Sequence, residues 1–344
     1  MSHSIPHRLS PDNYWSSSPT HSLPLSFLWW HCQFRYSQPS KISPSRDLRD
    51  PNPTLCTPIN LSVLKIAAKR PPIHYNYAMT KQVVFFGSSE FSVIVLEKLL
   101  NAQGLSLCAV VTTPDKPVGR HLKLTPNPVK VCAQKHHNIP VFTDIHDFLS
   151  TNLPTNTIAL VAAHGRRLGP KTLSKFNNQI YVIHPSLLPK YRGPSPLQQQ
   201  ILDGAVETGV TIIQADLGED TGPIVAQEKD VILPNDTTIT LGNRLFEIGA
   251  NWFIENSFQI SNFKFQIQDQ GLATFTKKLT RQDGFIPWEQ FHPEKLDRQF
   301  RAFIPWPGVW TTTPQGQRLK LIALQPQILV QLEGKTVQPW PIVV

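Results

Sequence analysis

From residue 81 onward the chain alternates apolar strands with segments of helical periodicity, and this alternation restricts the possible folds more than any other feature. Lys81–Gly87 is typical of a buried parallel strand, and Glu90–Leu100 carries apolar residues at helical spacing. Such a βαβ order predicts an α/β fold with a doubly wound, mostly parallel sheet, whose ligands bind at the carboxyl ends of strands. Further strands are predicted at 105–112, 139–142, 157–163 and 180–184, and helices at 128–136, 145–153, 171–176, 196–202 and 238–258. The run 209–222 is predicted to be a strand that leads into a turn.

The first loop after a strand argues against a nicotinamide enzyme. Gly87-Ser88-Ser89-Glu90 has one glycine where a dinucleotide-binding fingerprint needs three, so close approach of a pyrophosphate is not provided for.

Residues 1–78 differ from the rest, with eleven prolines and no sustained period, so we expect a disordered leader there. Three origins stay open: translation of sequence upstream of a true start at Met79, an organelle-targeting peptide, or a genuine extension. The scarcity of acidic residues suits a transit peptide, whereas the prolines and paired tryptophans do not suit its amphipathic helix. We favour the start at Met79.

The charge favours an anionic partner such as nucleic acid. Of the formal net charge of +9, residues 1–78 contribute +5 (eight Lys or Arg against three Asp), which leaves a modest +4 for the rest. The four cysteines form no C-x-x-C pair, so we expect neither a metal site nor a disulfide framework. No apolar run approaches the roughly 20 residues of a membrane span, so no membrane partner is expected.

Two polar residues stand where this fold places ligands. His184 ends a strand before Pro185, which cannot continue a central ladder, and a histidine there can titrate near neutrality and polarise a carbonyl. Asp220 follows a β-branched strand in a glycine-bracketed turn. Taken singly, such a histidine is more often structural, and such a carboxylate is as often merely solvated.

Together these segments resemble the methionyl-tRNA formyltransferase family of 10-formyltetrahydrofolate-dependent enzymes. The stretch 184–189 matches the family's H-x-S-L-L-P motif, and 220–222 matches its later D-T-G motif. Further similarity at 113–120 and 301–307 extends the resemblance from about Met79 almost to the C-terminus. Several separated motifs in the same order are more specific than any one of them.

The resemblance implies transfer of a formyl group from 10-formyltetrahydrofolate, as co-substrate, to the α-amine of methionine on initiator tRNA. His184 would hydrogen-bond the developing oxyanion, and Asp220 would tune His184 and assist proton transfer. A basic loop would contact the tRNA acceptor end through Lys116, Arg120 and Lys123. The folate pocket would be lined by Ser186, Leu187, Leu188, Pro189 and Gly165.

The resemblance also implies a domain order: a catalytic domain at 79–260, a linker at 261–279, and an abbreviated OB-like β-barrel at 280–344. Strands are expected at 309–313, 319–324 and 331–335 of that barrel. We expect a monomer in the cytoplasm, or in an organelle matrix if the leader is a transit peptide.

Two departures from the family pattern keep other functions open. Val182 stands where the family has asparagine, two residues before the histidine and on the same strand face, and losing one such donor typically costs about 10² to 10³ in rate. In the loop 163–170, His164 replaces a tyrosine, and Arg166 and Arg167 replace an apolar pair. The alternatives are formyl transfer to a small amine, hydrolysis of the folate, or a non-catalytic paralogue that binds tRNA or folate.

Overall fold

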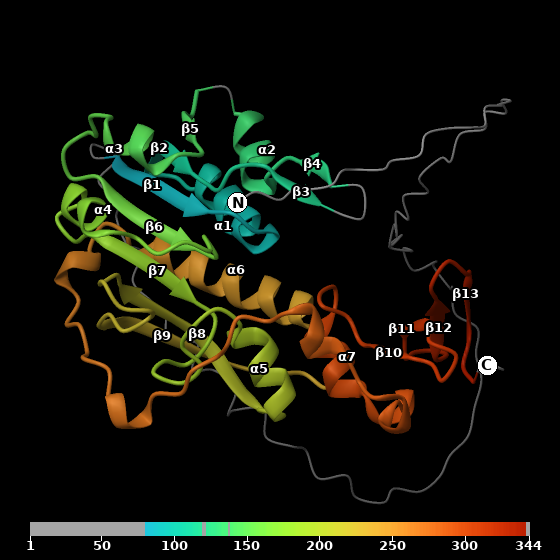
Figure 1. The fold of residues 1–344 in the computed structure, drawn as a ribbon. Coiled ribbons are helices and arrows are strands. Elements are labelled where there is room, and N and C mark those ends of the chain that lie inside the picture. The colour runs from blue at the N-terminus through green and yellow to red at the C-terminus, as the bar shows by residue number, and fades with distance from the viewer. Residues whose placement is uncertain (1–79, 119–121, 137, 342–344) are drawn as a thin grey trace, which may run out of the picture. The chain divides into compact units, whose positions relative to one another are not determined.

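The computed structural model describes residues 80–118, 122–136 and 138–341 (Figure 1). The predicted leader and the predicted tRNA contact Arg120 lie outside these residues. The chain divides into two units, 1–71 and 72–344, and the described residues all belong to the second.

The main sheet has seven strands in the order β5-β2-β1-β6-β7-β8-β9. The strands from β5 to β7 pair in parallel, whereas β8 and β9 are antiparallel, so the predicted doubly wound, mostly parallel sheet is confirmed. Sequence periodicity missed β9, because only its first residues are buried and the rest face solvent at the sheet edge. The bounds are β1 Lys81–Gly87, β2 Leu105–Val111, β5 Val141–Phe142, β6 Ile158–Ala162, β7 Ile180–His184, β8 Glu207–Gln214 and β9 Ile224–Val231.

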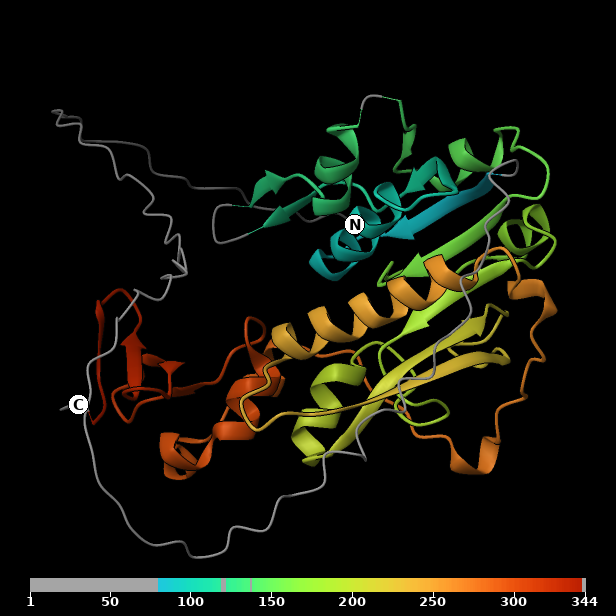
Figure 2. The same ribbon diagram turned by 180° about the vertical axis from the view of Figure 1, so that it is seen from behind.

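Helices cover both faces of this sheet (Figures 1 and 2). One core contains Val83 and Phe85 of β1, and the other contains Val84 and Phe86, because successive strand side chains point to opposite faces. The first core is covered by α1 (Glu90–Leu100), α2 (Pro128–Gln134), α5 (Pro196–Asp203) and α6 (Thr238–Asn256), and the second by α3 (Ile145–Leu149) and α4 (Pro170–Lys175).

The predicted basic loop contains a hairpin of β3 (Lys116–Val118) and β4 (Lys123–Thr125). Its base is fixed by Asp115, which pairs with Lys130 at 2.8 Å and accepts the Asn127 N–H at 3.0 Å. The hydrogen bond from Lys130 lowers the pKa of the Asp115 carboxyl. Side-chain contacts of Asp115 therefore hold the base of this hairpin.

A second, antiparallel sheet follows towards the C-terminus, in the order β10-β11-β12-β13, and it fits the predicted small barrel. Its strands are Trp310–Thr312, Arg318–Ala323, Leu329–Leu332 and Val337–Pro339. The strand predicted at 331–335 ends at Leu332, because Gly334 adopts a positive φ of 77° and turns the chain into β13. Before this sheet come α7 (Asp297–Phe303) and 3₁₀ turns at Ile260–Asn262, Gln270–Leu272, Arg281–Gly284, Trp288–Gln290 and Pro293–Lys295.

Among the described residues, no helix has the length and apolar character required to cross a membrane.

Helix α6 lies close to the sheet because Gly249 faces it. A Cβ at Gly249 would lie 2.6 Å from Cγ2 of Ile183 and 3.1 Å from Cγ2 of Val210. We therefore expect Gly249→Leu to overpack this contact and to lower the free energy of unfolding by about 1 to 3 kcal/mol. Asn251→Leu places the same side chain at an exposed position of α6 and is expected to stay within about 0.5 kcal/mol of wild type in urea denaturation. Equal effects of the two variants would contradict this packing.

Candidate active site

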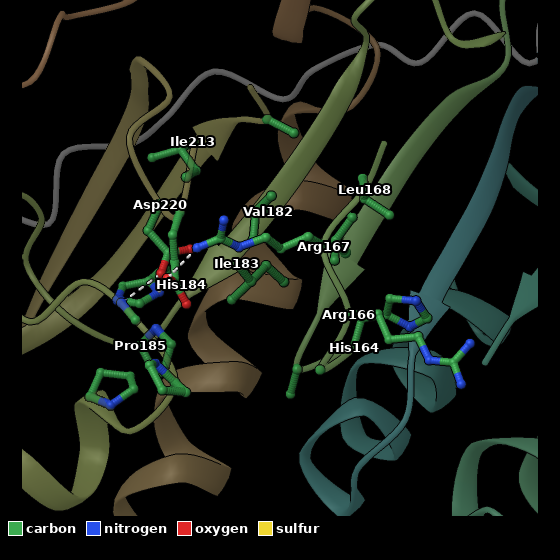
Figure 3. Close-up of a pocket in the computed structure, with 18 of the residues that line it drawn as sticks. His164, Arg166, Arg167, Leu168, Val182, Ile183, His184, Pro185, Ile213 and Asp220 are labelled. Carbon is green, nitrogen blue, oxygen red and sulfur yellow. Dashed lines mark hydrogen bonds and ion pairs between the residues drawn. The ribbon is translucent and has the colours of Figure 1, made fainter. Parts of the chain in front are cut away.

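A cavity of about 430 Å³ surrounds the carboxyl ends of β6 and β7 (Figure 3). Its floor is apolar: Val161, Val182 and Ile213 are register neighbours on β6, β7 and β8, and all three line the cavity. A second apolar wall comes from Phe91 and Phe246, whose rings stack at 5.4 Å. The cavity therefore lies where an open α/β sheet binds its ligands.

His184 is the last residue of β7 and borders the cavity, as predicted. Its side chain is 5% exposed, and Nδ1 lies 3.5 Å from Oδ2 of Asp220. Nε2 lies 3.0 Å from the backbone carbonyl of Tyr191. Both ring nitrogens thus face oxygen acceptors, and the two predicted catalytic residues are brought together (Figure 3).

Backbone geometry on the β8–β9 loop places Asp220 beside the histidine. Asp220 has a positive φ of 55°, and its Oδ2 accepts the Gly193 N–H at 2.8 Å. Two residues on, a Cβ at Gly222 would lie 1.8 Å from the carbonyl oxygen of Gln214, so only glycine fits there. In the D-T-G motif, the backbone conformation therefore requires glycine at 222 and places the Asp220 carboxylate at the site.

Ser186, Leu187, Leu188 and Pro189, which were predicted to line the folate pocket, are not among the residues that line this cavity. After Pro185 the chain turns onto β8: Oγ1 of Thr211 donates to the Ser186 carbonyl at 2.6 Å and accepts the Leu188 N–H at 3.0 Å. The chain returns to the cavity at Gly193. This motif therefore fixes the turn behind the cavity.

Gly165, a predicted folate contact, lines the cavity in the loop after β6. In the same loop His164 is 6% exposed, with its ring edge-on to Phe86 at 5.7 Å and Nδ1 3.4 Å from Oγ of Ser88. Burial, and then the nearby Arg166, lower the pKa of His164 to about 4. His164 is therefore a neutral side chain of the cavity at physiological pH.

Arg167 connects two loops at the cavity. Its Nη2 donates to Oε2 of Glu219, on the β8–β9 loop, at 2.7 Å. The predicted site did not include Arg167, His164, Tyr191 or Gly193. The signal for the last two was available, because the stretch 191–193 follows the recognised motif directly.

Lys116 and Lys123 do not line the cavity. Lys116 pairs with Thr125, and Lys123 pairs with residue 118, so the two lysines lie on one face of the β3–β4 hairpin. Both side chains are exposed.

Within the described part of the chain, no group of three or more His, Cys, Asp or Glu side chains is arranged to hold a metal ion.

Comparison with known families identifies two matching segments. The formyl transferase family model matches residues 81–256, and the model for the formyl transferase C-terminal domain matches residues 278–338. Among curated proteins, methionyl-tRNA formyltransferase of Roseiflexus castenholzii is 38% identical over 258 residues, covering 71% of this chain and 80% of that protein. The enzyme of the same name from Caldicellulosiruptor saccharolyticus is 37% identical, covering 73% and 82%.

Solved structures of low sequence identity share the fold. An N-formyltransferase from Helicobacter canadensis, in complex with folinic acid and dTDP-3-aminofucose, has a TM-score of 0.51 at 20% identity, covering 74% of this chain and 96% of that chain. A 4-N formyltransferase from Francisella tularensis has a TM-score of 0.53 at 14% identity, covering 71% and 97%.

The lowered pKa of His164 predicts how stability depends on pH. Because the folded pKa of about 4 lies below the ordinary 6.5, this group's contribution is fully present above pH 6.5 and is lost as the pH falls towards 4. Between pH 7 and pH 4, we expect wild type to lose about 3 kcal/mol of unfolding free energy more than His164→Phe, which cannot titrate. Urea denaturation of both proteins at the two pH values measures this difference, and parallel losses would contradict a buried neutral His164.

Proposed function

The chain belongs to the formyl transferase family, and from that membership and the site geometry we propose that it transfers the formyl group of 10-formyltetrahydrofolate to the α-amine of methionine on initiator tRNA. The observation that carries the proposal is the His184–Asp220 pair beside a cavity at the carboxyl end of β7. The relatives named for this activity are matched over about four fifths of their length.

The cavity suits the ring system of a folate. Flat aromatic ligands bind in mostly apolar pockets with a few polar groups that fix their orientation. Here the floor around Val182 and the stacked Phe91 and Phe246 supply the apolar surface, while Gly165 offers backbone groups at the rim. We propose that the turn 186–189 acts on the folate indirectly, by fixing Pro185 and Gly193.

We assign the chemistry to His184 and Asp220. When the amine attacks the formyl carbon, negative charge develops on the formyl oxygen and is stabilised by a positioned donor. His184 Nε2 can supply that donor by exchanging the Tyr191 carbonyl for the substrate oxygen. Asp220, held by the Gly193 N–H, orients the ring through Nδ1 and assists removal of the amine proton. The tetrahedral intermediate then collapses: the bond between the formyl carbon and N10 of the folate breaks, and N10 leaves as the protonated amine of tetrahydrofolate.

A second candidate function is non-catalytic binding of tRNA or folate, and Val182 favours it. Its methyl groups line the cavity two residues before His184, where the resembling family carries an amide donor. With that donor replaced, His184 is the side-chain donor that remains among the cavity-lining residues of β7.

We propose that the protein acts as a monomer in the cytoplasm, where initiator tRNA is used. Its proposed parts are a catalytic domain at 79–260, a linker at 261–279 and a C-terminal domain at 280–344, and the family models at 81–256 and 278–338 support this division. Lys116, Arg120 and Lys123 are the proposed contacts to the tRNA acceptor end.

The proposal is tested by incubating purified protein with charged initiator tRNA and 10-formyltetrahydrofolate. We expect formyl-methionyl-tRNA with multiple turnovers. His184→Ala is expected to lower kcat by about 10² to 10³, because it removes the oxyanion donor, and Val182→Asn to raise kcat, because it adds one. Quantification of formyl-methionine after hydrolysis of the tRNA provides the measurement.

The other functions give different results. Tight tRNA binding without turnover, also in Val182→Asn, would establish a binding protein. Formylation of a small amine that uncharged tRNA does not inhibit would establish a small-molecule enzyme instead.

The hairpin lysines give a separate prediction. Each lysine that neutralises a phosphate releases counterions, so tRNA binding weakens as salt is added. Lys116→Ala/Lys123→Ala should weaken tRNA binding, and the fall of log K with log salt should become less steep by about 1 to 2. Fluorescence anisotropy between 50 and about 200 mM salt measures that slope. Lys135→Ala/Lys171→Ala removes the same charge from exposed positions elsewhere and should leave the slope unchanged. Equal slopes for the two double variants would show that the hairpin lysines do not contact the tRNA.

A further inference from the structure

Arg192 is the largest fully buried side chain among the described residues, with 1% of its surface exposed. Its guanidinium has amide oxygens as hydrogen-bond partners: Nε and Nη2 donate to Oε1 of Gln268 at 3.0 and 2.6 Å, and Nη1 donates to Oε1 of Gln270 at 2.8 Å. The ring of Phe275 lies 5.9 Å from Cζ. A buried cation is tolerated only where such partners compensate for lost water, so this arrangement is strongly specified.

Both the oxygen and the nitrogen of the Gln268 side-chain amide form hydrogen bonds. Its Oε1 receives the guanidinium, and its Nε2 donates to the backbone carbonyls of Asp220 at 2.9 Å and Gly222 at 2.7 Å. Because a guanidinium has no acceptor, Arg192 dictates which end of the amide faces it. The NH₂ group must therefore point at the loop that carries Asp220.

Gln268 belongs to a segment that also holds the other side of the site. The Arg192 N–H donates to the Thr274 carbonyl at 2.9 Å, and the Thr276 N–H donates to the Arg192 carbonyl at 2.7 Å. Gly193 then has a φ of 103°, and a Cβ there would lie 2.8 Å from the carbonyl oxygen of Thr276. Residues 266–276, which we term the strap, therefore position both loops that meet at the hydrogen bond from Gly193 to Asp220.

We propose that Arg192 and Gln268 are positioning residues of the active site. The Arg192–Gln268 pair acts through the backbone of Asp220 and Gly222, and it holds the Asp220 carboxylate against Nδ1 of His184. Neither residue lines the cavity, so both act without touching substrate. The kinetic part of this inference rests on the proposed function, whereas its structural part does not.

Gln268→Glu tests the proposal with a nearly isosteric change. A glutamate still accepts from Arg192, but it cannot donate to the carbonyls of Asp220 and Gly222. We expect the Gly193 amide, which reports its bond to Asp220, to exchange hydrogen about tenfold faster or more in this variant, as measured by NMR. The amides of β1 should keep their wild-type rates, because the change is local.

Formylation kinetics provide the second readout. A misplaced Asp220 should lower kcat by about 10- to 100-fold and leave KM for both substrates within about twofold, because the lost interaction acts in the transition state. The matched control is Gln266→Glu: Gln266 is exposed in the same strap and pairs with Ile224 through its backbone. It should match wild type in both readouts.

Unchanged Gly193 exchange in Gln268→Glu would overturn the proposal, and so would unchanged kcat in an active protein. If wild type fails to formylate tRNA, the proposed function fails, and Gly193 exchange alone decides the positioning role. If Gln268→Glu does not fold, Gln270→Ala removes the exposed acceptor of Nη1 together with a 3.3 Å hydrogen bond from Nε2 of Gln270 to the Gln268 carbonyl. It is expected to accelerate Gly193 exchange by about twofold or more. Wild-type exchange in that variant would equally count against the proposal.

Discussion

The hydrogen bond from the Gly193 amide to the Asp220 carboxylate is the contact on which the site depends. It joins the loop after β7 to the loop after β8, and β8 runs antiparallel to β7. His184 lies between these two loops, and one of its ring nitrogens faces each loop. Because two loops supply its acceptors, the orientation of the ring follows from how the loops are held together.

These loops adopt unusual backbone conformations that their surroundings must hold. Tyr191, Gly193 and Asp220 all have positive φ, a conformation that is costly for residues other than glycine and persists where the surroundings enforce it. The strap supplies that enforcement through Thr274 and Thr276 on one loop and Gln268 on the other. A segment with little regular secondary structure thus fixes the geometry of the site.

Sequence reasoning succeeds where one residue's type determines its position. The burial of β1 on both of its faces follows from its apolar run, and His184 is placed at a strand end by Pro185. It fails where a role arises from contacts distant in sequence. Nothing in the local sequence of Gln268 indicates that its amide meets Arg192, 76 residues earlier, and the turn at 186–189 leaves the cavity because Thr211 captures its backbone.

Val182 lies on an apolar part of the cavity floor, two residues before His184. Its register neighbours Val161 and Ile213 are also apolar, so that floor of the cavity offers no neighbouring side-chain donor. Across the cavity, Arg167 is paired with Glu219, and His164 is neutral and turned towards Ser88. An asparagine at 182 would lie on the same strand face as His184, beside the charge that develops during transfer. In the proposed mechanism the apolar floor supplies no side-chain donor to the oxyanion, while the fold still places Asp220 beside His184.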